Sequence, residues 1–363
     1  MTYSAIIRYL NSCVNYEKNT SYSYKETLKL ERIQDFLAAI GNPQKFLRVI
    51  HVAGTKGKGS TCAFVANILR EAGFSVGLYT SPHLNDFRER IRILLPVGSR
   101  KRIVKDFEGM ISRKELSCLV AELKPEIKQY NRYSKYGPLS FFEVYTAIAF
   151  LYFKRKKVDF VVLETGMGGR LDATNAADSL VSGITPVSFE HVQKLGKTLT
   201  KIANEKAGII KNNTTIVFSA AQDKKVRKVI YQRCKRYQAS LYEVGRQIRY
   251  LKGKNSLEIK GLRKNYKNLR LNLLGEHQIA NASLAVGLVE GLSFYGFNIG
   301  DQAIRKGLYN TTWPGRCEVI AKEPLVVLDG AQNLASAGVL KSTVENIFKY
   351  KKLVPVFCVE GFG

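Results

Sequence analysis

The stretch Val49-Ile50-His51-Val52-Ala53-Gly54-Thr55-Lys56-Gly57-Lys58-Gly59-Ser60 decides the fold. Its first five residues are mostly apolar and β-branched, which is typical of a buried strand. A glycine-rich loop follows, and residues 61–72 then carry apolar side chains at helical spacing before Gly73. This order predicts a phosphate-binding loop, because glycines let backbone N–H groups converge on an anion at the positive end of a helix.

The loop also offers a cation, since Lys58 could reach a terminal phosphate. It departs from the strict G-x-x-x-x-G-K-[ST] pattern. Val52 stands where the first glycine belongs, and Gly59 separates Lys58 from Ser60. An ordinary glycine-rich turn therefore stays an alternative on this stretch alone.

The composition is that of a globular protein with room for two domains: 363 residues, 45% hydrophobic, mean hydropathy −0.14. No apolar run is long enough for a transmembrane helix, and the N-terminus lacks the pattern of a secretory signal. The six cysteines form no C-x-x-C pair. We therefore expect a cytoplasmic protein with neither a disulfide framework nor a zinc site.

The charge is strongly basic, with 57 Lys and Arg against 30 Asp and Glu and a net charge of +27. The basic residues are spread along the chain without the interleaved aromatic residues of a single-strand binder. We interpret them as a solvated surface that attracts anions in general. A nucleic-acid-associated ATPase is an alternative, but nucleic acid is not the expected partner.

Polar residues follow two further predicted strands. Residues 76–79 lead into Thr80-Ser81-Pro82-His83, and residues 158–163 lead into Glu164 and the glycine cluster of residues 166–169. The carboxyl ends of parallel strands gather ligands. Glu164 is placed to hold magnesium on a nucleotide, with a helix cap or loop role as the alternative.

Other segments continue the alternation of strands and helices. Ser140 and Glu143 form a capping box at the start of a strongly apolar helix. His191 stands alone in the sequence, where a structural role is the usual one. By pattern alone, Lys206 lies on the surface of a helix, and residues 248–274 form a basic β-like stretch.

We predict a domain boundary near residue 296, with a first domain over residues 1–296 and a second over 297–363. The sequence from Trp313 to Arg316 is where we expect the chain to enter the second domain. This domain holds one predicted helix and two or three strands. We expect it to be a short, incomplete Rossmann-like α/β domain.

Together these motifs resemble the folylpolyglutamate synthase/dihydrofolate synthase family of the Mur ligase superfamily, from about Leu30 to Asn333. The resemblance implies an α/β fold with a P-loop Mur-ligase-type central domain and a parallel-rich sheet. The motifs that carry it follow in the family's order: Leu30 to Ile33, His51 to Ser60, Thr80 to Leu84, Ser140 to Glu143, Glu164 to Asn175, Glu205 to Ile209, Trp313 to Arg316 and Asp329 to Ala331.

The resemblance implies an ATP-dependent ligase of folate biosynthesis, a cytoplasmic enzyme and a monomer. ATP would phosphorylate a carboxyl group of dihydropteroate or a reduced folate, and the amine of L-glutamate would attack the acyl phosphate. The nearest rival among enzymes is a cell-wall Mur ligase. A non-catalytic ATP-binding remnant is the alternative from another class, because family members continue beyond the equivalent of Gly363.

The resemblance also assigns site residues. Lys58, Lys206 and His191 would be catalytic, and Lys206 matches a lysine that the family carries as a carbamate. Mg²⁺ would be held by Ser81, Glu164 and His191. ATP would be bound by Gly54, Thr55, Gly57, Lys58, Gly59, Ser60, Asn281, Arg316 and Asp329.

Three positions depart from the family's pattern. Lys29 stands where the family has glycine, near the pteroate site. Gln332 replaces a histidine, so it can form hydrogen bonds but cannot carry a proton or a positive charge. Glu190 replaces an aspartate before His191.

Lys58→Ala should abolish nucleotide turnover and leave the fold intact, because the variant lacks the cation that reaches the terminal phosphate. Turnover is measured as phosphate release and folding by circular dichroism. Normal turnover by a well-folded variant would contradict the assignment of the phosphate-binding loop.

Overall fold

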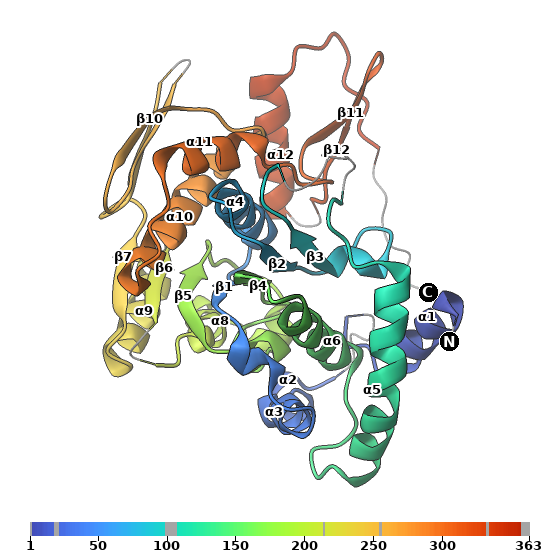
Figure 1. The fold of residues 1–363 in the computed structure, drawn as a ribbon. Coiled ribbons are helices and arrows are strands. Elements are labelled where there is room, and N and C mark those ends of the chain that lie inside the picture. The colour runs from blue at the N-terminus through green and yellow to red at the C-terminus, as the bar shows by residue number, and fades with distance from the viewer. Residues whose placement is uncertain are drawn as a thin grey trace.

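The computed structural model describes residues 2–17, 22–98, 107–212, 215–253, 256–331 and 334–356. Within them, a seven-stranded sheet has the order β3-β2-β4-β1-β5-β6-β7 (Figure 1). Strand β3 pairs antiparallel with β2, and the other neighbours pair in parallel. The strands are β1 (Val49–Ala53), β2 (Val76–Tyr79), β3 (Ile91–Leu94), β4 (Phe160–Glu164), β5 (Ser179–Ile184), β6 (Ile216–Ser219) and β7 (Ser240–Glu243).

Strand β1 lies in the centre of the sheet and is buried along its whole length. Ile50 and Val52 belong to the core on one face of the sheet, whereas Val49 belongs to the core on the other. A strand that is buried on both faces needs apolar side chains at successive positions. The predicted strands over residues 49–53 and 76–79 are confirmed with these bounds.

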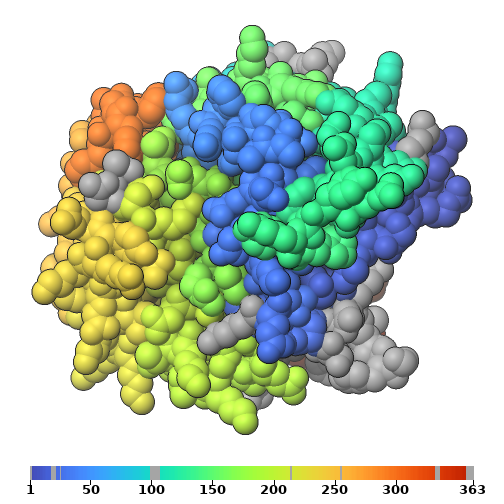
Figure 2. Space-filling model, turned by 90° about the horizontal axis from the view of Figure 1, so that it is seen from below, coloured from blue at the N-terminus to red at the C-terminus, as the bar shows by residue number. Residues whose placement is uncertain are grey.

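Helices cover both faces (Figure 1). The core of one face contains residues of α4 (Lys58–Glu71), α10 (His277–Gly291) and α11 (Asp301–Asn310). The other face carries α3 (Leu30–Ala39), α5 (Arg113–Tyr133) and α6 (Phe141–Lys156). Figure 2 shows this face, where α3 and α5 lie side by side. The rings of Phe36 in α3 and Tyr130 in α5 are in edge contact.

Short helices and a small sheet complete the first part of the chain. Strands β8 (Arg249–Lys252), β9 (Leu257–Lys260) and β10 (Asn265–Leu269) form an antiparallel sheet within the stretch predicted as β-like. None of the described helices is long and apolar enough to cross a membrane. The remaining helices are α1 (Tyr3–Ser12), α2 (Tyr24–Thr27), α7 (Val192–Leu195), α8 (Leu199–Lys206) and α9 (Lys224–Arg236), with 3-10 turns η1 (Pro43–Phe46), η2 (Phe87–Arg90), η3 (Ala173–Ala176), η4 (Ala207–Ile209) and η5 (Leu292–Tyr295).

The last described segment contains β11 (Glu318–Lys322), β12 (Leu325–Leu328) and α12 (Leu334–Ile347). The two strands pair antiparallel, and within the described residues they have no other partner. Their apolar side chains are largely open to solvent: Ile320 is 52% exposed and Leu328 47%. The strand predicted over residues 354–359 is not formed at 354–356, and residues 357–359 lie outside the described part.

Helix α11 packs closely against α4, the helix of the glycine loop. Ile304 and Leu308 belong to the same core as α4 and α10. Gly307 permits this contact, because a Cβ atom there would lie 2.4 Å from the Cα atom of Ile68. We therefore propose that the domain boundary follows α11, later in the chain than the predicted boundary at residue 296 and close to the expected entry near Trp313.

Gly307→Ala should lower the free energy of unfolding by about 1–3 kcal/mol, the usual cost of overpacking, because α4 and α11 would have to separate. Urea denaturation measures the change. Gly338 in α12 has open space around it, so Gly338→Ala serves as the control and should not destabilise the chain. Equal denaturation midpoints for the two variants would contradict the proposed packing constraint.

Candidate active site

The glycine loop lies at the carboxyl end of β1, against β5 and α10. Gly54 has a φ of +146°, and a Cβ atom there would lie 1.9 Å from Thr185 Oγ1. Gly57 has a φ of +86°, and its Cβ would lie 2.3 Å from Asn281 Oδ1. Only glycine fits these positions, because the backbone takes a left-handed conformation and has a neighbour within van der Waals distance.

Two lysines converge on the carbonyl oxygen of Gly54. Lys58 Nζ donates to it at 3.2 Å and also to the carbonyl of Thr55 at 3.4 Å. Lys206 Nζ, from the last turn of α8, donates to the same Gly54 oxygen at 2.6 Å. The loop therefore has two lysine side-chain nitrogens directly against its backbone.

Lys206 is only 2% exposed, so its prediction as a helix-surface lysine was wrong. The end of α8 is covered by the glycine loop, a contact that helical periodicity cannot show. Burial and, to a lesser extent, the positive charge of Lys58 together lower the pKa of Lys206 to about 7, although the charge of Glu190 opposes the shift. Glu190 lies 3.8 Å from Lys206 Nζ and 3.4 Å from Lys56 Nζ.

Glu164 ends β4, the neighbour of β1 in the sheet. Its buried carboxylate accepts a hydrogen bond from the Ser81 backbone N–H at 3.2 Å. Burial raises the pKa of Glu164, and the charge of Lys58 opposes that shift. Ser81 and Glu164 line one cleft together with Gly59, Trp313 and Arg316. The structure thus brings the predicted ligands Ser81 and Glu164 together beside the glycine loop.

Helix α10 adds polar side chains to the same region. Gln278 Nε2 donates to Ser60 Oγ at 3.3 Å, and Asn281 Nδ2 donates to Gln278 Oε1 at 3.0 Å. The predicted residues Ser60 and Asn281 are therefore linked through Gln278, which the sequence analysis missed. Its position three residues before Asn281, on one face of a helix, was the available signal.

His191 precedes α7 with a left-handed φ of 48°. Partial burial lowers its pKa; Glu190 opposes this shift, whereas Lys206 and Lys58 add to it. His191 therefore lies near the lysines of the loop, but no hydrogen bond joins it to Glu164 within the described residues. In that part of the chain, no three His, Cys, Asp or Glu side chains form a group that could hold a metal ion.

Arg316 and Asp329 lie beside each other around the hairpin of β11 and β12. Arg316 lines the cleft, and its Nη1 would lie 2.6 Å from a Cβ atom at Gly330. Asp329 Oδ2 accepts from the backbone N–H of Cys317 at 2.8 Å. Gln332 lies outside the described residues.

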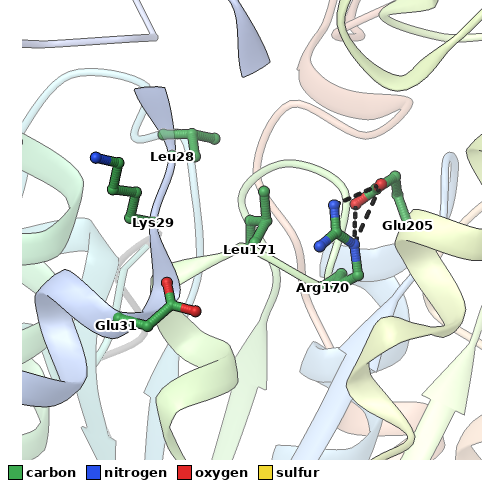
Figure 3. A pocket seen from close by; sticks show the side chains of 6 residues that line it. All are labelled: Leu28, Lys29, Glu31, Arg170, Leu171 and Glu205. Carbon is green, nitrogen blue, oxygen red and sulfur yellow. Dashed lines mark hydrogen bonds and ion pairs between the residues drawn. The ribbon is translucent and has the colours of Figure 1, made fainter. Parts of the chain in front are cut away.

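A second, more open depression of about 560 Å³ lies near α3 and α8 (Figure 3). Lys29 and Arg170 stand on opposite sides of it, and Arg170 pairs with Glu205 at 3.0 Å. Apolar and charged groups therefore meet in one open site. Its lining residues are Leu28, Lys29, Glu31, Arg170, Leu171 and Glu205.

Comparison with known proteins gives the family. The Mur ligase middle domain matches residues 132–289. A dihydrofolate synthase/folylpolyglutamate synthase of Bacillus subtilis (strain 168) is 38% identical over 336 residues, which cover 90% of this chain and 74% of that protein. The chain belongs to the folylpolyglutamate synthase/dihydrofolate synthase family of Mur ligases.

Solved structures of the family agree with this assignment. Mycobacterium tuberculosis folylpolyglutamate synthase complexed with ADP and AMPPCP matches with a TM-score of 0.81 at 34% identity, over 90% of this chain and 73% of that one. The apo form of the Lacticaseibacillus casei enzyme matches with a TM-score of 0.85 at 29% identity, over 96% of this chain and 82% of that one. The expected Mur ligase fold with its parallel-rich sheet is confirmed, and other members of the family bind ATP analogues.

The free energy of unfolding of this protein should depend on pH through Lys206. Between about pH 7 and 10.5 the unfolded chain keeps the proton that the folded chain releases. The free energy of unfolding should therefore rise with pH across this window. Urea denaturation measures this free energy. As the pH rises from about 7 to 10.5, the free energy of unfolding of wild type should increase relative to that of Lys206→Met. Lys201→Met, at an exposed position of α8, should follow wild type, and parallel curves for wild type and Lys206→Met would refute the shift.

Proposed function

We propose that this protein joins L-glutamate to the carboxylate of a pterin substrate, dihydropteroate or a reduced folate, at the expense of ATP. The observation that carries the proposal is the cleft where the glycine loop, Glu164 and Arg316 meet in a chain of this family. The match over 90% of the chain does not favour a non-catalytic remnant.

The chemistry requires activation, because a carboxylate is a poor electrophile. Transfer of the terminal phosphoryl group of ATP to this carboxylate turns one oxygen into a leaving group. The glutamate amine then attacks the acyl phosphate and releases phosphate. Lys58 and the backbone N–H groups of the glycine loop would balance the negative charge that gathers on the transferred group.

A magnesium ion fits the donors at the edge of the sheet. The Glu164 carboxylate is buried, faces the cleft and has the Ser81 backbone as its hydrogen-bond donor. Mg²⁺ prefers oxygen ligands and keeps water or phosphate oxygens in its shell, so the Glu164 carboxylate and the Ser81 hydroxyl suit it. We propose Ser81 and Glu164 as ligands, with His191 as a third, and the ion would neutralise phosphate charge there.

Lys206 has the property that a carbamate needs. Only the neutral amine reacts with carbon dioxide, and a pKa of about 7 leaves much of the Lys206 amine neutral near physiological pH. The resulting anion would lie next to the ammonium groups of Lys58 and Lys56. We propose that carbamylated Lys206 braces the transferred phosphate or a second metal ion.

The remaining assignments follow the resemblance. Asn281, Arg316 and Asp329 would contact ATP, and the depression that contains Lys29 would receive the pterin substrate. A lysine there adds positive charge to a site for an anionic substrate. We further propose a cytoplasmic monomer whose activity does not require nucleic acid.

Incubation of the purified chain with ATP, L-glutamate and either dihydropteroate or tetrahydrofolate tests the function. Mass spectrometry should find a pterin product heavier by one glutamyl unit, and the preferred acceptor identifies the substrate class. ATP hydrolysis should depend on both the pterin and glutamate. Bound nucleotide without a glutamyl product would reject the proposal.

A further inference from the structure

The backbone of the loop of residues 81–86 is hydrogen-bonded to one buried carboxylate. Glu89 is 4% exposed and belongs to η2, which follows the loop. Its Oε2 atom accepts from the backbone N–H of Leu84 at 2.6 Å, and its Oε1 atom accepts from those of Asn85 at 2.9 Å and Asp86 at 2.6 Å. Three successive backbone donors thus point at one side chain.

This loop contributes to both walls of the nucleotide cleft. At one end, the Ser81 backbone N–H donates to Glu164. At the other, the Leu84 side chain lies against Gly315, because a Cβ atom at Gly315 would be 3.3 Å from Leu84 Cδ1. Ser81, Leu84 and Glu89 all line the cleft with Arg316. A shift of the loop would therefore move Ser81 away from Glu164 and loosen the contact beside Arg316.

Arg90, the residue after Glu89, also bonds to the loop. Arg90 is 1% exposed and donates from Nε to His83 Nδ1 at 2.8 Å. Its two terminal nitrogens donate to Glu17 at 2.8 and 2.6 Å. The loop is thus fixed at His83 by Arg90 and over residues 84–86 by Glu89.

We propose that Glu89 is a positioning residue for nucleotide binding: it holds the loop of residues 81–86 so that Ser81 stays at Glu164 and Leu84 at Gly315. The inference rests on the proposed function only for the identity of the ligand as ATP. A carboxylate suits this task because both of its oxygens accept hydrogen bonds. A glutamine has the same shape, but its NH₂ group would face a backbone N–H donor and leave it unsatisfied.

Glu89→Gln tests the proposal through binding, without any turnover. Trp313 is the single tryptophan of the chain and lies against Gly59 in the cleft, so its fluorescence should respond to a bound nucleotide. Titration with AMPPCP and magnesium should show an apparent Kd at least tenfold weaker in Glu89→Gln than in wild type. An unchanged Kd in the folded variant would overturn the proposal.

Glu290→Gln is the matched control. Glu290 is also a buried carboxylate that accepts backbone N–H groups, from Leu262 at 2.6 Å and Arg263 at 3.3 Å, but it lies at the other end of α10 from Asn281. The Glu290→Gln variant should be less stable than wild type but should bind AMPPCP with the wild-type Kd. Weakening in both variants would mean a general loss of structure and overturn the positioning role.

Glu89→Asp separates geometry from charge and remains informative if Glu89→Gln does not fold. The shorter side chain keeps the negative charge but cannot reach all three donors. It should also weaken nucleotide binding, whereas a wild-type Kd would show that charge alone matters and refute the proposal.

Wild type that binds AMPPCP but forms no glutamyl product would reject the proposed ligase function and leave the Glu89 test valid.

Discussion

The carbonyl oxygen of Gly54 is the point on which the site depends, because the ammonium groups of Lys58 and Lys206 both donate to it. Lys58 begins α4, and Lys206 ends α8, so this single acceptor joins the glycine loop to helices from the two faces of the sheet. Protonation of both lysines would put two positive charges together where little water can solvate them. The lowered pKa of Lys206 is the electrostatic consequence of burial beside Lys58, and it leaves much of the amine neutral near physiological pH, as the proposed carbamylation requires.

The rest of the candidate active site is built from chain segments that are far apart in sequence. Glu164 comes from the end of β4, Gln278 and Asn281 from the start of α10, and Arg316 from the segment before β11. Acid and base alternate around the loop, since Glu190 lies between Lys56 and Lys206 while Glu164 faces Lys58. A phosphate group that enters the cleft would thus meet cations already held in place by protein carbonyls and carboxylates, which limits the reorganisation needed during phosphoryl transfer.

The sequence allowed the central strands and the glycine loop to be predicted, because an apolar run buried on both faces and a loop without side chains leave strong local patterns. It did not reveal α5, whose surface is largely polar and which contains Pro125. It placed Lys206 on a surface, since periodicity describes one helix and not the loop that covers its end. Glu89 was missed for a similar reason: its spacing from Asp86 is that of a capping box, but the bonds to the N–H groups of Leu84 and Asn85 depend on the path of the loop. Ser81 and Glu164 were found because strand ends in a parallel sheet converge.

The exposed apolar side chains of β11 and β12 affect how copies of the chain associate with one another. Within the described residues, both outer edges of this hairpin lack a paired strand, and such edges are templates for association between copies. The net charge of +27 opposes that association, because two copies repel each other before their apolar surfaces meet. Salt shortens the range of this repulsion to roughly 10 Å at 0.1 M and to about 3 Å at 1 M. Association of copies through this hairpin is thus opposed by long-range electrostatic repulsion, and higher ionic strength weakens that opposition.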